Sequence, residues 1–65
     1  MNIIVNGKPR TVAAATLDAV LEELGYAGPR VATARAGEFV PAARRAECHL
    51  QEGDVVEILG PMQGG

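Results

Sequence analysis

The sequence predicts an α+β fold, in which a mixed sheet of four to five strands carries one main helix on one face. Three observations support this prediction. Short β-branched runs open and close the chain, at residues 3–5 and 55–59. Residues 17–24 lie between them and show helical periodicity. A helix with one apolar stripe must cover one face of a sheet, so the two kinds of element belong together.

The bulk composition limits what the protein can be. Sixty-five residues are enough for one domain, which we expect to span residues 1–65 and to enclose a single small core. A net charge of −2 and a single Tyr, a single Phe and no Trp argue against nucleic-acid binding. One cysteine excludes an internal disulfide. We see no signal peptide and no membrane span, so we expect a soluble, cytoplasmic protein.

The N-terminal strand is predicted to form a hairpin. Asn6-Gly7 follows the apolar run, and Asn-Gly is a strong hairpin signal because both residues tolerate positive φ. The return strand should cover roughly residues 10–14. Pro9 has no N–H to donate, so this second strand should lie at the edge of the sheet.

The helix is the best-marked element of the sequence. Thr16 is a typical N-cap residue, and Gly25 stands where a left-handed residue commonly ends a helix. Between them, four apolar residues at helical spacing form one stripe: Leu17, Val20, Leu21 and Leu24.

The second half of the chain predicts three more strands. We expect strands at residues 31–36, 38–40 and 55–59, a turn or short 3₁₀ segment at 42–47, and a loop at 50–54. The first and last strands are the most apolar and should form the central pair. A connection through the helix makes that pair parallel.

Strand alternation divides the apolar residues between two faces. The side chains expected to face the helix are Ile3, Val5, Val56 and Ile58, with Val12, Val31, Val40 and Leu50 completing the core. Ile4, Val55 and Leu59 should project from the other face, where Phe39 can join them as a docking patch for a partner. The alternative is that they are ordinary isolated surface aliphatics.

The chain ends in Met62-Gln63-Gly64-Gly65, which suggests a reactive tail. A terminal glycine has no Cβ, so a Gly-Gly end can enter a narrow channel in another protein. Its carboxylate, with a pKa near 3.5, reacts poorly at neutral pH unless it is activated. Our hypothesis is that a globular body of about residues 1–60 presents a flexible tail, residues 61–65. The alternative is an ordinary frayed terminus.

Taken together, these features resemble the ThiS family of sulfur carriers, which have the ubiquitin-like β-grasp fold. The matching stretches run along the whole chain: Ile3-Ile4-Val5-Asn6-Gly7, Thr16-Leu17, Leu24-Gly25, Val40-Pro41, Glu52-Gly53-Asp54, Val56-Glu57-Ile58 and Gly64-Gly65. The chain departs from the family pattern at Arg35-Ala36, where a hydrophobic residue and Asn are usual. It departs again at Gln63, where a small aliphatic residue is common.

The resemblance implies a function in thiamine biosynthesis. A ThiF-like adenylyltransferase would use ATP to convert the Gly65 carboxylate into an acyl-adenylate. A sulfur donor system, such as a cysteine desulfurase, would replace AMP and leave a thiocarboxylate. A ThiG-like thiazole synthase would then take the sulfur. The chain would be a substrate of these enzymes, would not itself be an enzyme, and would bind no cofactor or metal.

Three alternatives to this function remain open at this stage. The small subunit of molybdopterin synthase, a MoaD-like carrier, shares the fold, the tail and the activation chemistry. A non-reactive β-grasp interaction module would use the fold alone. A protein modifier would be joined to lysine residues through Gly65.

Two further pairs of residues are interpreted as bystanders. Cys48 and His49 could be read as a nucleophile and its base, but adjacent residues on an extended chain point in opposite directions. His49 has no second histidine or cysteine pair with which to bind a metal. Arg44-Arg45 could contact an acidic partner, but a solvated surface pair is the expected reading.

Overall fold

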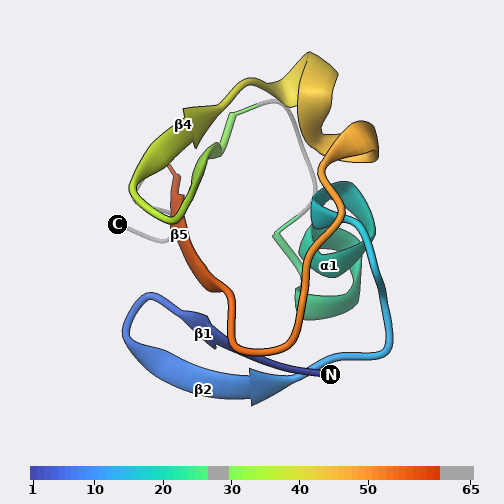
Figure 1. Ribbon diagram of the computed structural model, residues 1–65. Coiled ribbons are helices and arrows are strands. Elements are labelled where there is room, and N and C mark those ends of the chain that lie inside the picture. The colour runs from blue at the N-terminus through green and yellow to red at the C-terminus, as the bar shows by residue number, and fades with distance from the viewer. Residues whose placement is uncertain (27–29, 61–65) are drawn as a thin grey trace.

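The computed structural model describes residues 1–26 and 30–60, and these contain five strands, one α-helix and one 3₁₀ helix (Figure 1). In chain order they are β1 (Asn2–Val5), β2 (Lys8–Thr11), α1 (Leu17–Leu24), β3 (Ala32–Arg35), β4 (Glu38–Val40), η1 (Ala42–Glu47) and β5 (Val55–Leu59). The strands form one sheet in the order β2-β1-β5-β3-β4. The sheet curves around α1, which covers one of its faces.

The central pair of strands is parallel, as predicted. β1 and β5 align with Ile4 opposite Val55 and Val5 opposite Val56, whereas all other strand pairs are antiparallel. Strand β2 lies at the edge of the sheet, which is where Pro9 can be accommodated without losing a ladder hydrogen bond.

The predicted position of the return strand was wrong by two to three residues. A two-residue turn sets Val5 directly opposite Lys8, so β2 begins at Lys8 and not at residue 10. It ends at Thr11, although the Val12 N–H still donates to the Met1 carbonyl at 2.9 Å. The N–H groups of Ala13 and Ala14 donate to the Glu23 carboxylate at 3.0–3.1 Å, which attaches this segment to α1.

Helix α1 has the predicted ends, but the Thr16 side chain does not accept a hydrogen bond from an N–H group of the first turn. Thr16 occupies the N-cap position without a capping hydrogen bond, and its hydroxyl donates to Asp18 Oδ1 at 2.6 Å. The same carboxylate oxygen accepts the Ala19 N–H at 2.8 Å. At the other end, Gly25 has a φ of 88°, the left-handed conformation that glycine adopts at low cost.

The core lies between α1 and the sheet and has the predicted composition. Its buried hydrophobic residues are Ile3, Val5, Val12, Leu17, Val20, Leu21, Leu50, Val56 and Ile58. Leu24, Val31 and Val40 are half-buried against this cluster. Alternation along β1 and β5 therefore sorts the side chains between the two faces of the sheet as expected.

Arg45 is the main departure from the predicted surface. Its side chain is 6% exposed, and its guanidinium donates from Nε to Thr33 Oγ1 at 3.1 Å and from Nη2 to the Val31 carbonyl. Arg44, by contrast, is exposed and ion-pairs with Glu47. In a 3₁₀ helix successive residues point about 120° apart, so one arginine faces solvent while its neighbour turns toward β3. The expectation of two solvated arginines was wrong for Arg45.

Candidate functional site

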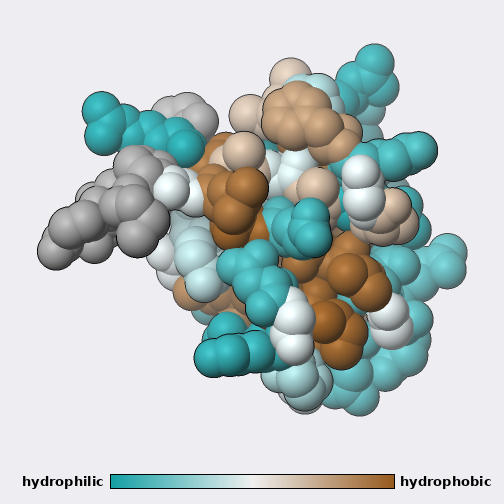
Figure 2. Space-filling model, turned by 90° about the vertical axis from the view of Figure 1, so that its left-hand side faces the viewer, coloured by the Kyte–Doolittle hydropathy of each residue, from teal (hydrophilic) through white to brown (hydrophobic). Residues whose placement is uncertain are grey.

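The sheet face opposite α1, which we call the open face, carries exposed apolar side chains. Phe39 and Leu59 are each 69% exposed and Val55 is 47% exposed, while Ile4 is half-buried beside Val55. Figure 2 shows hydrophobic side chains gathered on this side of the molecule, with hydrophilic ones between them. The structure thus places all four residues predicted to form a docking patch on or at the edge of one surface.

A shallow hollow of about 90 Å³ lies within the open face. The strand register explains its shape. Ala34 lies opposite both Glu57 and Phe39, and Ala32 lies opposite Leu59, so short side chains on β3 alternate with long ones on β4 and β5. Two alanines therefore form the floor, and Phe39, Glu57 and Leu59 form the walls.

Sequence reasoning missed this hollow and the place of Glu57 in it. The signal was present in the run Ala32-Thr33-Ala34, which puts two small residues on the same face of a strand. Their lack of bulk is what opens the hollow beside Phe39.

The proposed reactive residues, Met62, Gln63, Gly64 and Gly65, lie outside the described residues, and so does Pro61. The structure describes the point from which the tail begins. Gly60 follows β5 directly, and a Cβ added to it would lie 3.0 Å from Val31 Cγ1. The Val31 carbonyl is held in turn by Arg45. The start of the tail therefore adjoins Leu59 on the open face and leaves little room for a side chain.

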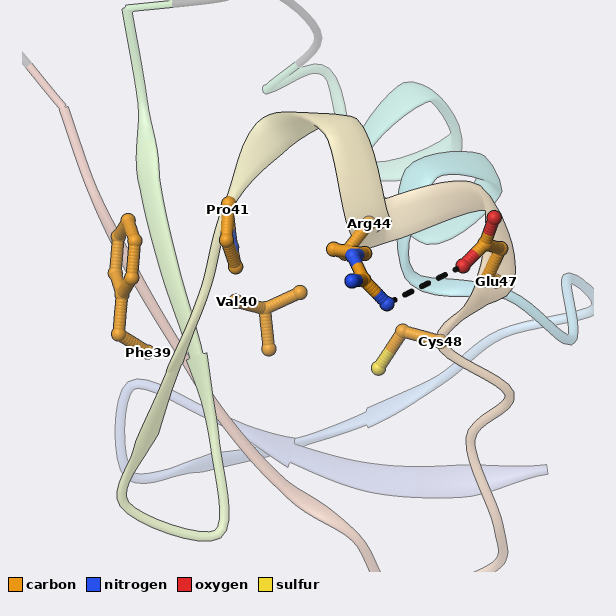
Figure 3. Close-up of a pocket in the computed structure, with 6 residues that line it drawn as sticks. All are labelled: Phe39, Val40, Pro41, Arg44, Glu47 and Cys48. Carbon is orange, nitrogen blue, oxygen red and sulfur yellow. Dashed lines mark ion pairs between the residues drawn. The ribbon is translucent and has the colours of Figure 1, made fainter.

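A second hollow, of about 280 Å³, lies on the other side of Phe39 (Figure 3). It is lined by Phe39, Val40, Pro41, Arg44, Glu47 and Cys48. Arg44 and Glu47, both on η1, form an ion pair at one side of it, with Nη1 and Oε1 3.7 Å apart. Both side chains are 73% exposed, so the pair adds little to stability.

Cys48 and His49 lie in different environments. Cys48 is half-buried at the second hollow and packs against the core, whereas His49 is exposed. Backbone hydrogen bonds hold this segment beside the start of α1, from the Leu17 N–H to the Cys48 carbonyl at 2.9 Å and from the Leu50 N–H to the Ala15 carbonyl at 2.8 Å. This is the arrangement expected of adjacent residues on an extended chain.

Two negative findings apply to residues 1–26 and 30–60. No three His, Cys, Asp or Glu side chains in these ranges come together in a way that could hold a metal ion. No helix there has the length and apolar character needed to cross a membrane.

The model of the ThiS family matches residues 3–65, nearly the full sequence. The chain belongs to the ThiS family. The departures noted above, Arg35-Ala36 and Gln63, therefore lie within a chain whose membership is clear, and they are variations on the family pattern.

Individual relatives agree with this assignment. The sulfur carrier protein ThiS of Thermus thermophilus is 39% identical over 61 residues, which cover 94% of this chain and 95% of that protein. A thiazole synthase of Paramagnetospirillum magneticum is 36% identical over 66 residues, but this chain spans only 20% of its length. The crystal structure of the thiamine biosynthesis protein ThiS of Geobacter metallireducens superposes with a TM-score of 0.82 at 35% identity, with both chains fully covered. The fold is thus the ubiquitin-like β-grasp of this ThiS family chain.

Proposed function

We propose that this chain is the sulfur carrier for thiazole formation in thiamine biosynthesis, and that Gly65 carries the sulfur. The observation that carries the proposal is the match to the Thermus thermophilus sulfur carrier, which covers nearly all of both chains. The family match also extends through Gly64-Gly65. The fold supports it as well, because the central strand β5 leads directly into the tail through Gly60.

The proposed chemistry begins at the Gly65 carboxylate. As an anion it resists attack by nucleophiles, so a ThiF-like adenylyltransferase first joins it to AMP from ATP and releases pyrophosphate. The mixed anhydride has a good leaving group. The outer sulfur of a persulfide, such as that carried by a cysteine desulfurase, attacks the acyl carbon, displaces AMP and forms an acyl disulfide. A thiol then reduces the S–S bond and is itself oxidised to a disulfide, which releases the thiocarboxylate that delivers sulfur to thiazole synthase without free sulfide. In this scheme the chain is a substrate of each enzyme, and ATP is consumed by its partner.

The globular body, about residues 1–60, serves in this proposal as the part that partners hold. Partners would dock on the open face at Ile4, Phe39, Val55 and Leu59, while residues 61–65 enter the active site. Exposed apolar side chains support this role because they are available for burial. Fully extended, residues 60–65 reach about 20 Å. That length lets the carboxylate enter a deep site while the body stays outside.

A thiazole synthase as the final acceptor is supported by the second relative. In Paramagnetospirillum magneticum, a segment resembling this whole chain forms one-fifth of a protein named thiazole synthase. A carrier and its acceptor must meet in every reaction cycle, so their presence in one chain would raise the local concentration of each for the other.

Adenylation is the step to test first. The protein is incubated with ATP and a ThiF-like adenylyltransferase, and hydroxylamine is added to trap the acyl-adenylate as a hydroxamate. We expect ATP-dependent formation of one hydroxamate per chain at Gly65. A variant lacking Gly65 should unfold at the same temperature as the wild type and give no product. An equal yield from that variant would contradict the proposal.

A further inference from the structure

Glu57 is a charged residue among the apolar side chains of the open face. It lies on the open face between Val55 and Leu59, and Ala34 lies opposite it on β3. By the strand register, no other charged residue of the described strands points to this face, because Lys8, Arg10, Arg35 and Glu38 pair with residues on the α1 side. Glu57 therefore stands out as the one ionic group at the centre of the apolar patch.

The Glu57 carboxylate has no partner of its own within the described part of the chain. The ion pairs there are those of Arg35 with Asp54 and Arg44 with Glu47. None of the side-chain hydrogen bonds involves Glu57, in contrast to Glu23 and Glu52, which both accept backbone N–H groups. Among residues 1–26 and 30–60, no side chain or backbone group neutralises or hydrogen-bonds the Glu57 carboxylate.

A partner that covers the open face must remove water from the Glu57 carboxylate. Burying an unpaired carboxylate costs several kcal/mol, which would offset much of the gain from burying the surrounding apolar groups. A purely apolar partner surface is therefore disfavoured. The partner must bring a cation to Glu57, and doing so also fixes the orientation in which it docks.

The hollow next to Glu57 distinguishes between the two common cations. Its walls combine the ring of Phe39, the aliphatic side chain of Leu59 and the carboxylate, and its volume is about 90 Å³. Arginine can contact all three of these walls. Its apolar stem packs on aliphatic surface, and its planar guanidinium stacks on an aromatic ring and binds a carboxylate through two hydrogen bonds. A lysine ammonium is not planar, so it cannot stack on the ring, and it does not present two parallel N–H donors to a carboxylate.

We propose that this hollow receives an arginine side chain of the adenylyltransferase, with its stem between Phe39 and Leu59 and its guanidinium on Glu57. This rests on the proposed function. The adenylyltransferase is the favoured partner because it must bind both ATP and the Gly65 carboxylate, and therefore needs cations near its site. The hollow ends at Leu59, the last residue of β5, and Gly60 is the one residue between Leu59 and the tail at 61–65. An arginine there would hold the body while the tail reaches the ATP.

The test measures the dependence of the adenylation rate on the concentration of the full-length carrier. Glu57→Gln keeps the shape and removes the charge, and Glu57→Lys reverses it. Glu22→Gln is the matched control, because it removes the same charge from the helix on the opposite side of the sheet. We expect Glu57→Gln to raise KM about tenfold with little change in kcat, and Glu57→Lys to raise it about a hundredfold. Glu22→Gln should leave KM unchanged.

A second arm identifies the arginine. Surface arginines of the adenylyltransferase are changed one at a time to glutamate, and each variant is assayed with wild-type carrier and with Glu57→Lys. We expect one variant to be impaired with the wild type and restored by Glu57→Lys.

Each outcome decides the matter. The arginine pocket would be overturned by equal KM values for wild type and Glu57→Gln, by equal effects of Glu57→Gln and Glu22→Gln, or by the absence of a restored pair. In each of these cases, adenylation of the wild type would still support the carrier function. Failure of the wild type to be adenylated at all would overturn both.

Discussion

The two hairpins that flank β5 have the same turn but reach it with different residues. In the β1–β2 turn, Asn6 and Gly7 have φ values of 51° and 82°, and in the β3–β4 turn, Ala36 and Gly37 have values of 52° and 81°. Positive φ at both positions is what a two-residue hairpin turn of type I′ requires. Asparagine tolerates this conformation well, whereas alanine does not.

The Asn6 side chain also makes two hydrogen bonds to β5. Its Nδ2 donates to the Ile58 carbonyl at 3.0 Å, and its Oδ1 accepts the Ile58 N–H at 2.8 Å. These bonds connect the first turn to the central strand. Ala36 has no side-chain polar group, and its backbone N–H donates to the Val55 carbonyl at 2.9 Å. The first hairpin thus has a turn residue that tolerates positive φ and a side-chain link to β5, and the residue at the same place in the second hairpin supplies neither.

Contacts from outside the second hairpin compensate for its turn. Arg45 reaches the Val31 carbonyl and the Thr33 hydroxyl, and that hydroxyl in turn donates to the Val40 carbonyl at 2.7 Å. Arg35 ion-pairs with Asp54, with 3.1 Å between Nε and Oδ2. The hairpin with the less favourable turn and the small alanines also forms the hollow of the open face. Local sequence rules are commonly broken where a surface has a function.

The largest effect should come from removing the buried arginine that anchors the second hairpin. Arg45→Met leaves the Val31 carbonyl without this charged donor, so we expect the free energy of unfolding to fall by about 2–3 kcal/mol. Arg44→Met is the matched control and should change it by less than about 0.5 kcal/mol, because Arg44 is exposed. Urea unfolding followed by far-ultraviolet circular dichroism measures both. Similar losses from the two variants would show that Arg45 is not an anchor.

Removing the asparagine from the first turn should have the next largest effect. Asn6→Ala loses both hydrogen bonds to Ile58 and puts alanine at positive φ, so the expected loss is about 2 kcal/mol by the same measurement. Asn6→Gly, which removes the bonds but relieves the backbone, should lose less. If both variants were as stable as the wild type, the Asn6 side chain would not stabilise the first hairpin.

The opposite change in the second turn should increase stability. Ala36→Asn introduces a residue that accepts positive φ more readily, and we expect a gain of about 0.5–1 kcal/mol in the free energy of unfolding. Ala34→Asn, two residues earlier in β3, controls for the asparagine itself and should give no gain, since asparagine is a poor strand former. A loss at position 36 would mean that the turn carries no backbone strain.

The smallest effect concerns pH and the attachment of the first hairpin to α1. Hydrogen bonds from the Ala13 N–H and then the Ala14 N–H hold the pKa of Glu23 below its ordinary value of 4.5. Because the folded-state pKa is lowered, the stabilisation is present above that ordinary value and is lost as pH falls through the folded-state pKa. Glu23→Gln should therefore be less stable than the wild type at neutral pH, with the difference disappearing in acid. A difference that stays constant across this range would contradict the lowered pKa.

The two hairpins also show which parts of the fold can be predicted from the sequence. Asn6-Gly7, the stripe on α1 and the β-branched runs of β1 and β5 each have a local signature, and together they predict the helix, the parallel central pair and the core. The end of β2 and the inward direction of Arg45 were not predicted, because both depend on residues distant in the sequence. The amides of Ala13 and Ala14 turn to Glu23 and end β2 early, and Arg45 turns inward because β3 offers acceptors.

The candidate site was predictable to the same degree. Alternation alone placed Ile4, Val55 and Leu59 on one face, and the strand registers agree with that placement, whereas their use for docking stays a prediction. The hollow required the registers of three strands, because its floor comes from β3 and its walls come from β4 and β5. No periodicity within one strand can show that Glu57 lies next to Phe39 across Ala34.

We propose that Gly65 of this ThiS family chain carries sulfur, and the intact mass of the protein after reaction shows whether it does. The protein is incubated with ATP, a ThiF-like adenylyltransferase, a cysteine desulfurase, cysteine and a thiol reductant that releases the thiocarboxylate from the acyl disulfide, and its intact and fragment masses are then measured. We expect a mass gain equal to the exchange of one oxygen for one sulfur, located at Gly65 and absent when ATP is omitted. An unchanged mass in the complete reaction, or sulfur located on Cys48, would contradict the account.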